Sequence, residues 1–388
     1  MQSYDLIGDI HGQADELTQL LELLSYKKKN NIWQHQNRKV IFLGDFVDRG
    51  DKQKEVINIV RPMIDKGFAL SVMGNHEYNA IAYFTKNGKG GYYRDHNEKN
   101  FNQHKAFLSA YEENLEEYKD VIEWFKTLPL WLDLEGLRVV HACWDIDLVN
   151  RIGKLLENGV LHKSSDKSTV EFRAIETLLK GKEIPLPNGQ FFYDKDKNPR
   201  KHIRIKFWER NAKTYKDLFM GPEDALKYIP DLALEDDYSV PYPADEKPLF
   251  LGHYWMEGEI KPLAENIACI DYSVAKPGGK LVAYRWDGEE KIDASKFVSV
   301  RRSKSNDSSN LSEFNLFNWS DVSDFVDWEG RPAVVVDEAD GSRSAWVVPR
   351  AAEPGAWEPA SGADIFDSGV LVSKAEFQEI FEDRLAKG

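Results

Sequence analysis

Five short stretches of the chain end in residue types that can bind metal ions and transfer protons. Each is an apolar run that leads into Asp, Asn or His, in most cases beside a glycine. The polar residues are, in chain order, Asp9 and His11, Asp45 and Asp48, Asn75 and His76, His141, and His253. Oxygen and imidazole donors without paired thiolates favour Mn, Fe or Zn over a cysteine-rich structural site. One such strand end would be unremarkable, but five together indicate a shared metal centre.

The apolar patterns predict the elements that would position these residues. Short apolar runs at 4–7, 40–43 and 68–73 indicate buried strands, and helical spacing of apolar residues predicts helices over 13–24 and around 56–63. This alternation indicates neighbouring parallel strands with helical crossovers. The carboxyl ends of such strands meet at one edge, where open α/β sheets bind their ligands. The candidate residues therefore lie where a site is expected.

The remainder of the first 300 residues is less regular. The segment 78–130 has a mostly helical and polar pattern, and 150–245 is mixed and rich in loops. Further strands are expected over 137–140, 249–251, 268–272 and 280–284. The first two of these strands lead directly to His141 and to Gly252-His253, so they extend the list of strand-end donors.

Three blocks of sequence carry a resemblance to a known family. Gly8-Asp9-Ile10-His11-Gly12, Gly44-Asp45-Phe46-Val47-Asp48-Arg49-Gly50 and Gly74-Asn75-His76-Glu77 resemble the signature blocks of the phosphoprotein phosphatase (PPP) type of calcineurin-like metallophosphoesterases. His141 and His253 match the two later histidines of that family. The resemblance covers roughly residues 1–300. It implies an α/β fold, a central β-sandwich flanked by helices, with a site for two metal ions at its mouth.

The resemblance also implies a division of the metal ligands. One ion would be held by Asp9, His11 and Asp45, and the second by Asp45 as a bridge together with Asn75, His141 and His253. Manganese is the expected metal, with iron and zinc as alternatives. A hydroxide bridging two such ions would attack phosphorus in line, because the ions lower the pKa of bound water toward neutrality.

Other residues of the blocks match the family's proton-transfer and phosphate-binding groups. His76 is the implied general acid, and Asp48 would hold its tautomer and raise its pKa. Arg49 offers a planar fork for phosphate oxygens, and Asn75 would also contact substrate. Arg210 resembles the Trp-x-Arg segment of bacterial relatives and is a candidate second phosphate clamp, although a surface arginine behind a buried tryptophan is equally consistent.

Two departures from the family pattern bear on the substrate. Met73 replaces an arginine that precedes Gly-Asn-His-Glu in eukaryotic protein phosphatases, and Ala142-Cys143 follows His141 where two glycines are common. The leading hypothesis is hydrolysis of phosphomonoesters, including phosphoprotein. The alternatives are symmetrical hydrolysis of dinucleoside polyphosphates and a non-catalytic binding or regulatory protein. Tyr92, Tyr93, Tyr254 and Trp255 are candidates for the border of the cleft, and the histidines outside the blocks are interpreted as surface or structural: His35, His96, His104, His162 and His202.

Composition limits the classes of protein to consider. The chain has 388 residues, with 51 basic against 65 acidic side chains and a net charge of −14, which argues against binding duplex nucleic acid through a broad basic surface. Its apolar runs stay well short of the 18 residues that indicate a membrane span. The N-terminus has no signal-peptide pattern, and two cysteines suit a reducing compartment. A cytoplasmic protein is therefore expected.

The last part of the chain differs from the rest. Residues 303–388 contain 7 basic and 17 acidic residues, a net charge of −10. The predicted organisation is a catalytic domain over 1–302, a polar linker over 303–312, and a small acidic α+β module over 313–388. An Asp-Gly turn between 331–337 and 343–348 predicts a hairpin, and Ser373–Glu376 resembles a helix capping box. Binding a protein partner, covering the cleft and a purely structural role all remain open for this module.

Overall fold

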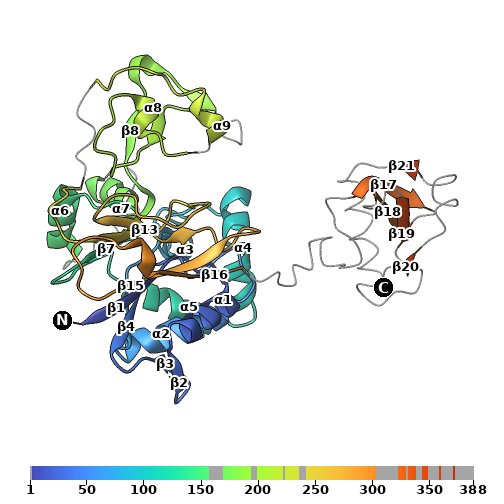
Figure 1. Cartoon of the computed structure of the whole chain (residues 1–388), viewed down its shortest axis with the longest axis horizontal. Coiled ribbons are helices and arrows are strands. Elements are labelled where there is room, and N and C mark those ends of the chain that lie inside the picture. The colour runs from blue at the N-terminus through green and yellow to red at the C-terminus, as the bar shows by residue number, and fades with distance from the viewer. Residues whose placement is uncertain are drawn as a thin grey trace. The chain divides into compact units, whose positions relative to one another are not determined.

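The computed structural model describes residues 2–156, 169–193, 199–221, 223–235 and 242–302, and the strands at 322–328, 331–337, 343–347, 358–359 and 370–371. The chain divides into two compact units, residues 1–303 and 304–388 (Figure 1). The linker expected over 303–312 lies outside the described residues. Each unit is considered by itself.

The first unit contains a six-stranded mixed sheet. Its order is β14-β15-β1-β4-β5, with β16 on the free side of β15. The strands are β1 (Ser3–Ile7), β4 (Arg38–Phe42), β5 (Ala69–Ser71), β14 (Asp271–Tyr272), β15 (Lys280–Trp286) and β16 (Phe297–Arg301). The three strands β1, β4 and β5 run parallel, as the β-α-β-α-β pattern predicted, while β15 is antiparallel to β1.

A second sheet supplies the other layer. Its order is β13-β12-β7-β6, and β12 runs parallel to both β7 and β13. The strands are β6 (Trp131–Asp133), β7 (Arg138–Val140), β12 (Leu249–Leu251) and β13 (Ile267–Cys269). Because β7 and β12 are parallel, the two histidines that follow them emerge at the same edge.

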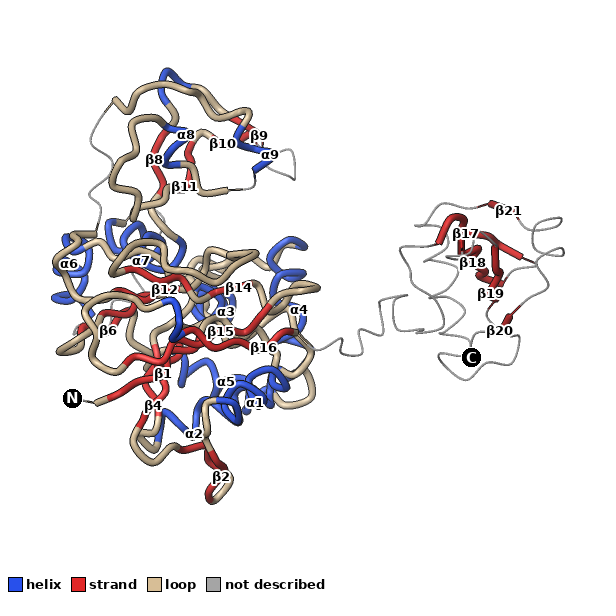
Figure 2. The backbone as a smooth tube through the Cα atoms, viewed as in Figure 1, coloured by secondary structure: helices blue, strands red, loops and turns tan. Residues whose placement is uncertain are grey.

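The two sheets share one buried apolar cluster. Leu6 and Ile41 of the first sheet pack in it with Val139 and Phe250 of the second, and all four are fully buried. Side chains alternate between the faces of a strand, so the neighbouring Ile7 lies on the other face, in a cluster with helical residues. The unit is therefore a β-sandwich with helices outside it, as the resemblance implied (Figure 2).

Helices cover the outer faces of the sandwich. They are α1 (Ala14–Leu23), α2 (Gln53–Asp65), α3 (Asn75–Phe84), α4 (Glu98–Tyr111), α5 (Leu115–Phe125), α6 (Ile146–Leu156) and α7 (Val170–Lys180). Leu17, Leu20 and Leu21 form the buried face of α1, at the spacing that predicted this helix. A short hairpin of β2 (Lys27–Lys29) and β3 (Ile32–Gln34) follows α1.

Residues 183–235 form a small lobe with its own core, in the region whose pattern was hardest to interpret. It contains β8 (Glu183–Pro185), β9 (Phe192–Tyr193), β10 (Pro199–Arg200), β11 (His202–Arg204), α8 (Tyr215–Leu218), α9 (Glu223–Leu226) and a 3-10 turn at Pro187–Gly189. A second 3-10 turn, at Ala294–Lys296, lies outside the lobe. Ile184, Ile203 and Tyr215 are buried together in the lobe. Its short strands and many turns explain why no periodicity is visible in the sequence.

The second unit contains a five-stranded antiparallel sheet of order β20-β19-β18-β17-β21. Its strands are β17 (Val322–Trp328), β18 (Arg331–Asp337), β19 (Arg343–Val347), β20 (Glu358–Pro359) and β21 (Val370–Leu371). The predicted hairpin is present, because β18 pairs antiparallel with β19. The helix expected after Ser373 lies outside the described residues. Among the described parts of the whole chain, helices long and apolar enough to cross a membrane are absent.

Candidate metal centre

The strand-end residues come together at one edge of the sandwich. Asp9 and His11 follow β1, and Asp45 and Asn75 follow β4 and β5 of the same sheet. His141 and His253 follow β7 and β12 of the other sheet. All six side chains are buried, except that of His253, which is partly buried. The two sheets therefore each contribute a share of one donor cluster.

Backbone hydrogen bonds fix the loops that carry these donors. The amides of Ile10 and His11 both donate to the carbonyl oxygen of Asp45, at 3.0 and 2.8 Å. The fully buried Glu77 carboxylate accepts from the amides of Asp45, Phe46 and Gly74 at 2.8, 2.8 and 2.9 Å. Glu77 belongs to the third signature block. Its hydrogen bonds connect the second and third loops, a structural role that was not predicted from the sequence.

Two glycines permit the close approach of the loops. Gly44 has φ +88°, and a Cβ at this position would lie 2.3 Å from the amide nitrogen of Gly74. A Cβ on Gly252 would lie 2.1 Å from Oδ1 of Asp9. Neither separation is compatible with a side chain, so packing requires glycine at both positions, and the positive φ of Gly44 favours glycine there as well.

Asp45 is the centre of the donor cluster. Its Oδ2 lies 3.6 Å from Nε2 of His11 and 3.4 Å from Nε2 of His141. Two compact donor groups share it, one with His11 and His76 and the other with His141 and His253. Oδ1 of Asn75 lies 2.7 Å from Nδ1 of His253 and 3.2 Å from Nε2 of His141. A carboxylate shared by two donor groups is the arrangement expected of a ligand that bridges two ions.

The hydrogen bonds of the rings leave other donor atoms free for metal. Nδ1 of His11 donates to the carbonyl of Val47 at 3.0 Å, and Nδ1 of His141 donates to that of Leu43 at 2.7 Å. Such bonds turn the Nε2 atoms toward the cluster. Among the described residues, Oδ1 of Asp9 and the Nε2 atoms of His11 and His253 are buried without a hydrogen-bond partner. Buried polar atoms rarely stay unpaired, so this donor set fits divalent cations.

The electrostatics of the cluster lead to the same conclusion. Burial, together with Asp271 and Asp45, raises the pKa of Asp9 well above its usual range. Burial, with His76 and Arg49 nearby, lowers the pKa of His11 to about 3. Burial opposes the charge of His141, but Asp45 and Asp9 more than offset it and raise its pKa to about 10. Carboxylates crowded in a buried site gain most from added positive charge, which divalent ions would supply.

Beside the cluster, Asp48 lies between two histidines. Its Oδ2 is 2.6 Å from Nδ1 of His76, and its Oδ1 is 2.8 Å from Nδ1 of His104. Burial raises the pKa of Asp48, but His104 and His76 outweigh it and hold that pKa well below its usual range. The pairing of His76 with Asp48 follows the expectation, whereas His104 was interpreted only as surface or structural. The sequence does not indicate the contact between His104 and Asp48, because His104 lies on α4, 56 residues after Asp48.

Arg49 is held at the mouth of the cluster by its backbone and by Trp255. The backbone φ angles of Asp48 and Arg49 are +69° and +72°, an uncommon conformation for non-glycine residues that costs free energy and often marks functional sites. The guanidinium carbon of Arg49 lies 3.7 Å from the centroid of the Trp255 ring. This stacking leaves the edge of the guanidinium available to an anion.

Two arms of an open cleft meet at the cluster. One has a volume of about 910 Å³ and includes Arg204, Tyr254 and Lys276 in its walls. The other, of about 690 Å³, includes Arg94 and Lys105. Both arms contain Arg49, Asn75, His76 and Trp255. A substrate can therefore extend to either side of the donor cluster.

Arg210, the candidate second phosphate clamp, is not among the residues that line the two cleft arms. Its Nη2 donates to the carbonyl of Tyr242 and to Oδ1 of Asn266, both at 3.0 Å. Asn266 precedes β13 and so lies at the amino end of the parallel strands β12 and β13, opposite the end that leads to His253. The two hydrogen bonds of Arg210 therefore connect separate segments of the chain. Arg204, in the same lobe, lines the cleft.

The remaining histidines and Cys143 have structural surroundings where they are described. The His96 ring stacks on those of Tyr83 and Tyr92, with centroid separations of 3.8 and 3.9 Å. Cys143 is buried, and burial raises the pKa of its thiol to about 12, consistent with its expected role as a small apolar residue. His162 lies outside the described residues. Tyr254 lines one arm of the cleft and Trp255 lines both, at the border that the sequence suggested.

Comparison with known proteins places this site in a family. The family model described as "Calcineurin-like phosphoesterase" matches residues 4–242. A relative from Oceanobacillus iheyensis, named bis(5'-nucleosyl)-tetraphosphatase PrpE [asymmetrical], is 32% identical over 161 residues, 41% of this chain and 63% of that protein. A relative from Marinomonas sp., named bis(5'-nucleosyl)-tetraphosphatase, symmetrical, is 26% identical over 74% of this chain and 94% of its own length.

A solved structure of a cold-active protein-tyrosine phosphatase from a Shewanella species is 15% identical, with a TM-score of 0.43 over 78% of this chain and 81% of its own. The present chain spans less than two thirds of the length of the first curated relatives it matches. The family match covers more than half of the chain and includes all three signature loops and His141. The chain belongs to the calcineurin-like phosphoesterase family.

Proposed function

We propose that this protein is a phosphoesterase that hydrolyses phosphate esters with two divalent metal ions. The observation that carries the proposal is the buried Asp45, which lines one cleft arm and is shared by two donor groups, one with His11 and His76 and one with His141 and His253. Asp9, His11 and Asp45 would hold one ion, and Asp45, Asn75, His141 and His253 the other. When bound, such ions supply Lewis acidity and a nucleophilic hydroxide at neutral pH. Manganese is the proposed metal, with iron and zinc as alternatives.

The residues around the donor cluster suit the remaining needs of ester hydrolysis. Arg49 is positioned to bind the oxygens of the phosphate being cleaved. His76 would donate a proton to the leaving oxygen, because Asp45 and Asp48 outweigh the effect of burial and raise its pKa above its ordinary value. Asp48 accepts from Nδ1 of His76, and Nε2 of the same ring lies 3.9 Å from Oδ2 of Asp45, at the donor cluster.

The substrate class has two candidates. Phosphomonoesters, including phosphoprotein, need only the groups around Arg49 and His76. Dinucleoside polyphosphates are favoured by the two arms, since each places basic side chains beside the donor cluster: Arg204 and Lys276 in one, Arg94 and Lys105 in the other. The names of the relatives agree with this second class. A dinucleoside polyphosphate, which has a nucleoside at each end, would occupy both arms at once.

A substrate panel with a metal series would test the proposal. Purified protein would be assayed on p-nitrophenyl phosphate, phosphopeptides and diadenosine tetraphosphate with manganese, iron, zinc and magnesium, and with EDTA. We expect manganese-dependent hydrolysis that EDTA abolishes. If none of these esters is cleaved with any metal, the alternative of a non-catalytic binding or regulatory protein is favoured instead.

Two further expectations stay proposals. A cytoplasmic location is supported by the two buried free cysteines, which are typical of reducing compartments. Binding of a protein partner by the acidic module over 313–388 is supported by the net charge of −10 over residues 303–388. Partner capture with the isolated first unit as the control would test the second proposal.

A further inference from the structure

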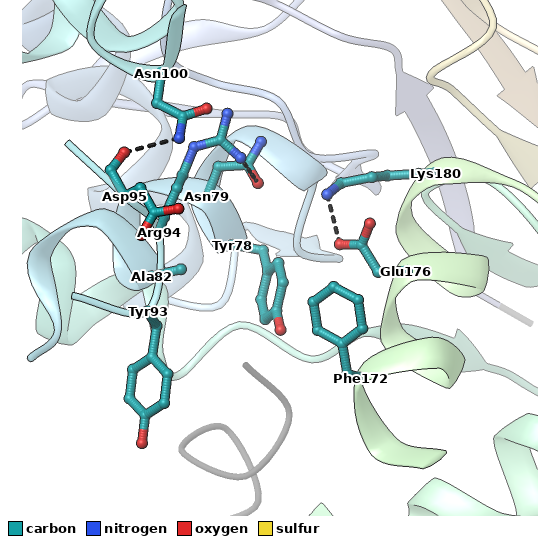
Figure 3. Close-up of a pocket in the computed structure, with 10 residues that line it drawn as sticks. All are labelled: Tyr78, Asn79, Ala82, Tyr93, Arg94, Asp95, Asn100, Phe172, Glu176 and Lys180. Carbon is teal, nitrogen blue, oxygen red and sulfur yellow. Dashed lines mark hydrogen bonds and ion pairs between the residues drawn. The ribbon is translucent and has the colours of Figure 1, made fainter. Parts of the chain in front are cut away.

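A third pocket opens beside the cleft arm that contains Lys105. Its volume is about 220 Å³, and it shares Asn79 and Arg94 with that arm. Figure 3 shows Arg94 and Asn79 on one side of the pocket and Lys180 with Glu176 on the other, with Tyr78 between them.

Helix α3 connects this pocket to the catalytic groups. Asn75 and His76 form the first turn of α3, while Asn79 and Ala82 lie on the following turns. With a rise of about 1.5 Å per residue, Asn79 and Ala82 lie roughly 5 to 9 Å along the helix from His76. The pocket therefore begins about one helical turn along α3 from His76.

Arg94 is a charged group without a matching carboxylate. Its Nη1 donates to Oδ1 of Asn79 at 2.9 Å, and its Nη2 donates to Oε1 of Gln103 at 2.6 Å. No carboxylate of the described residues forms an ion pair with Arg94 within 4 Å, whereas Arg204, which lines the other cleft arm, pairs with Glu183. Neutral amides thus fix the position of the guanidinium without neutralising its positive charge, which can therefore attract an anion. A partly buried arginine held in this way is well suited to bind an anion at the junction of arm and pocket.

The pocket itself suits an uncharged ring rather than a second anion. Lys180 is paired with Glu176, and Asp95 adds a further negative charge, so the acidic and basic side chains in the walls are balanced. Phe172 and Tyr93 supply aromatic faces, and Asn79 and Asn100 supply amide groups. Aromatic faces combined with amides and carboxylates are the surroundings in which proteins bind nucleobases.

We propose that Arg94 binds a phosphate of a dinucleoside polyphosphate beyond the one being cleaved, and that the adjoining pocket holds the nucleoside at that end of the substrate. This inference rests on the proposed phosphoesterase function and names its substrate class. Phosphomonoesters lack the second phosphate, so Arg94 would not strengthen their binding. Arg94 and Phe172 would both strengthen the binding of diadenosine polyphosphates.

Three variants separate the parts of this proposal. Arg94→Ala removes the anion contact, and Phe172→Ala removes an aromatic wall. Arg173→Ala is the matched control, because Arg173 is an exposed arginine on the same helix as Phe172 and does not line the pocket. We expect Arg94→Ala to lower kcat/KM for diadenosine tetraphosphate at least tenfold, and to leave kcat/KM for p-nitrophenyl phosphate within twofold. Phe172→Ala should lower kcat/KM for diadenosine tetraphosphate about fivefold.

Inorganic tripolyphosphate, which has no nucleoside, is the second probe. Its inhibition of p-nitrophenyl phosphate hydrolysis should weaken at least tenfold in Arg94→Ala and be unchanged in Phe172→Ala. Equal losses on both substrates would overturn the proposal, because Arg94 would then contact the phosphate that is cleaved. Unchanged kinetics in Arg94→Ala, or a loss confined to acidic phosphopeptides, would overturn it as well. Arg94→Lys retains the charge and guards against a folding defect.

Failure of the proposed function would be recognised separately. If the wild-type protein hydrolyses neither substrate, calorimetric titration with diadenosine tetraphosphate in EDTA still tests the pocket. Binding by the wild-type protein that is weakened tenfold in Arg94→Ala would support the subsite in the absence of catalysis. Equal binding by both proteins, or no binding by either, would contradict it.

Discussion

The metal centre and the walls of the cleft are built in different ways. The donors of the centre stand on short loops that are fixed by backbone hydrogen bonds, by the Glu77 carboxylate and by glycines such as Gly44. The walls of the cleft and of the adjoining pocket include side chains from α4, α7 and the lobe over 183–235, among them Lys105, Lys180 and Arg204. The centre is therefore set by strand topology, whereas the walls depend on elements that vary more easily.

This difference separates chemistry from specificity. A change in a donor loop should disturb the reaction with every substrate, because the loops hold one another in place. A change in a wall should alter the preference among substrates and leave hydrolysis of a small ester intact.

Replacing the shared carboxylate should have the largest effect. Asp45→Asn keeps the shape of the side chain but removes the charge between the two donor groups. We expect kcat for p-nitrophenyl phosphate to fall by about 10³ or more, since the metal ions supply most of the stabilisation of the transition state. Steady-state kinetics with manganese checks this. A variant that retains a tenth of wild-type activity would contradict the central role of Asp45.

Replacing the proposed acid should have the next largest effect. His76→Asn removes the proton donor and should lower kcat by about 10² on esters with poor leaving groups. The effect should be smaller for p-nitrophenolate, which needs little protonation, so phenyl phosphate is the matched comparison. Equal losses on both esters would indicate that His76 acts through metal binding instead.

Two glycines allow a test of how tightly the loops are fixed. Gly44→Ala places a Cβ 2.3 Å from the Gly74 nitrogen and should cost about 3 kcal/mol or more of unfolding free energy. Gly67 has a similar φ of +73° but nothing within 4 Å of the added atom, so Gly67→Ala should cost only about 1 kcal/mol. Denaturant unfolding measures both. Equal costs would show that packing between the loops is unimportant.

His104 should have a moderate effect that reveals how Asp48 is held. His104→Phe removes the bond to Oδ1 of Asp48 and should lower kcat about tenfold with KM little changed, since the position of the acid is altered and the phosphate contacts are kept. His104→Gln retains an N–H donor and should recover part of the loss. A change in KM alone, or no recovery, would indicate a general packing role.

Removing residues 304–388 should have the smallest effect on the reaction. The donor groups and both cleft arms lie in the first unit, so kcat/KM for p-nitrophenyl phosphate should stay within twofold. The substrate panel applied to the truncated chain provides the measurement. An increase of tenfold would instead support the interpretation that the acidic module restricts access to the cleft.

The sequence predicted the centre better than the walls for a physical reason. Asp9, Asp45 and Asn75 each follow an apolar strand directly, so the topology of parallel strands brings them together. His104 and Arg94 reach the site from helical and loop segments whose register on the sandwich follows from tertiary packing alone. Arg210 matched a short motif, but the lobe directs it to Asn266 and presents Arg204 to the cleft instead.

Counting metal ions in the purified protein tests the central claim most directly. After loading with manganese and removal of free metal, elemental analysis of the wild-type protein should give close to two ions per chain. Asp45→Asn should lose at least one of them while its circular dichroism stays that of the folded wild type. Retention of both ions by the variant, or less than one ion in the wild type at saturating manganese, would contradict a centre built around a shared Asp45.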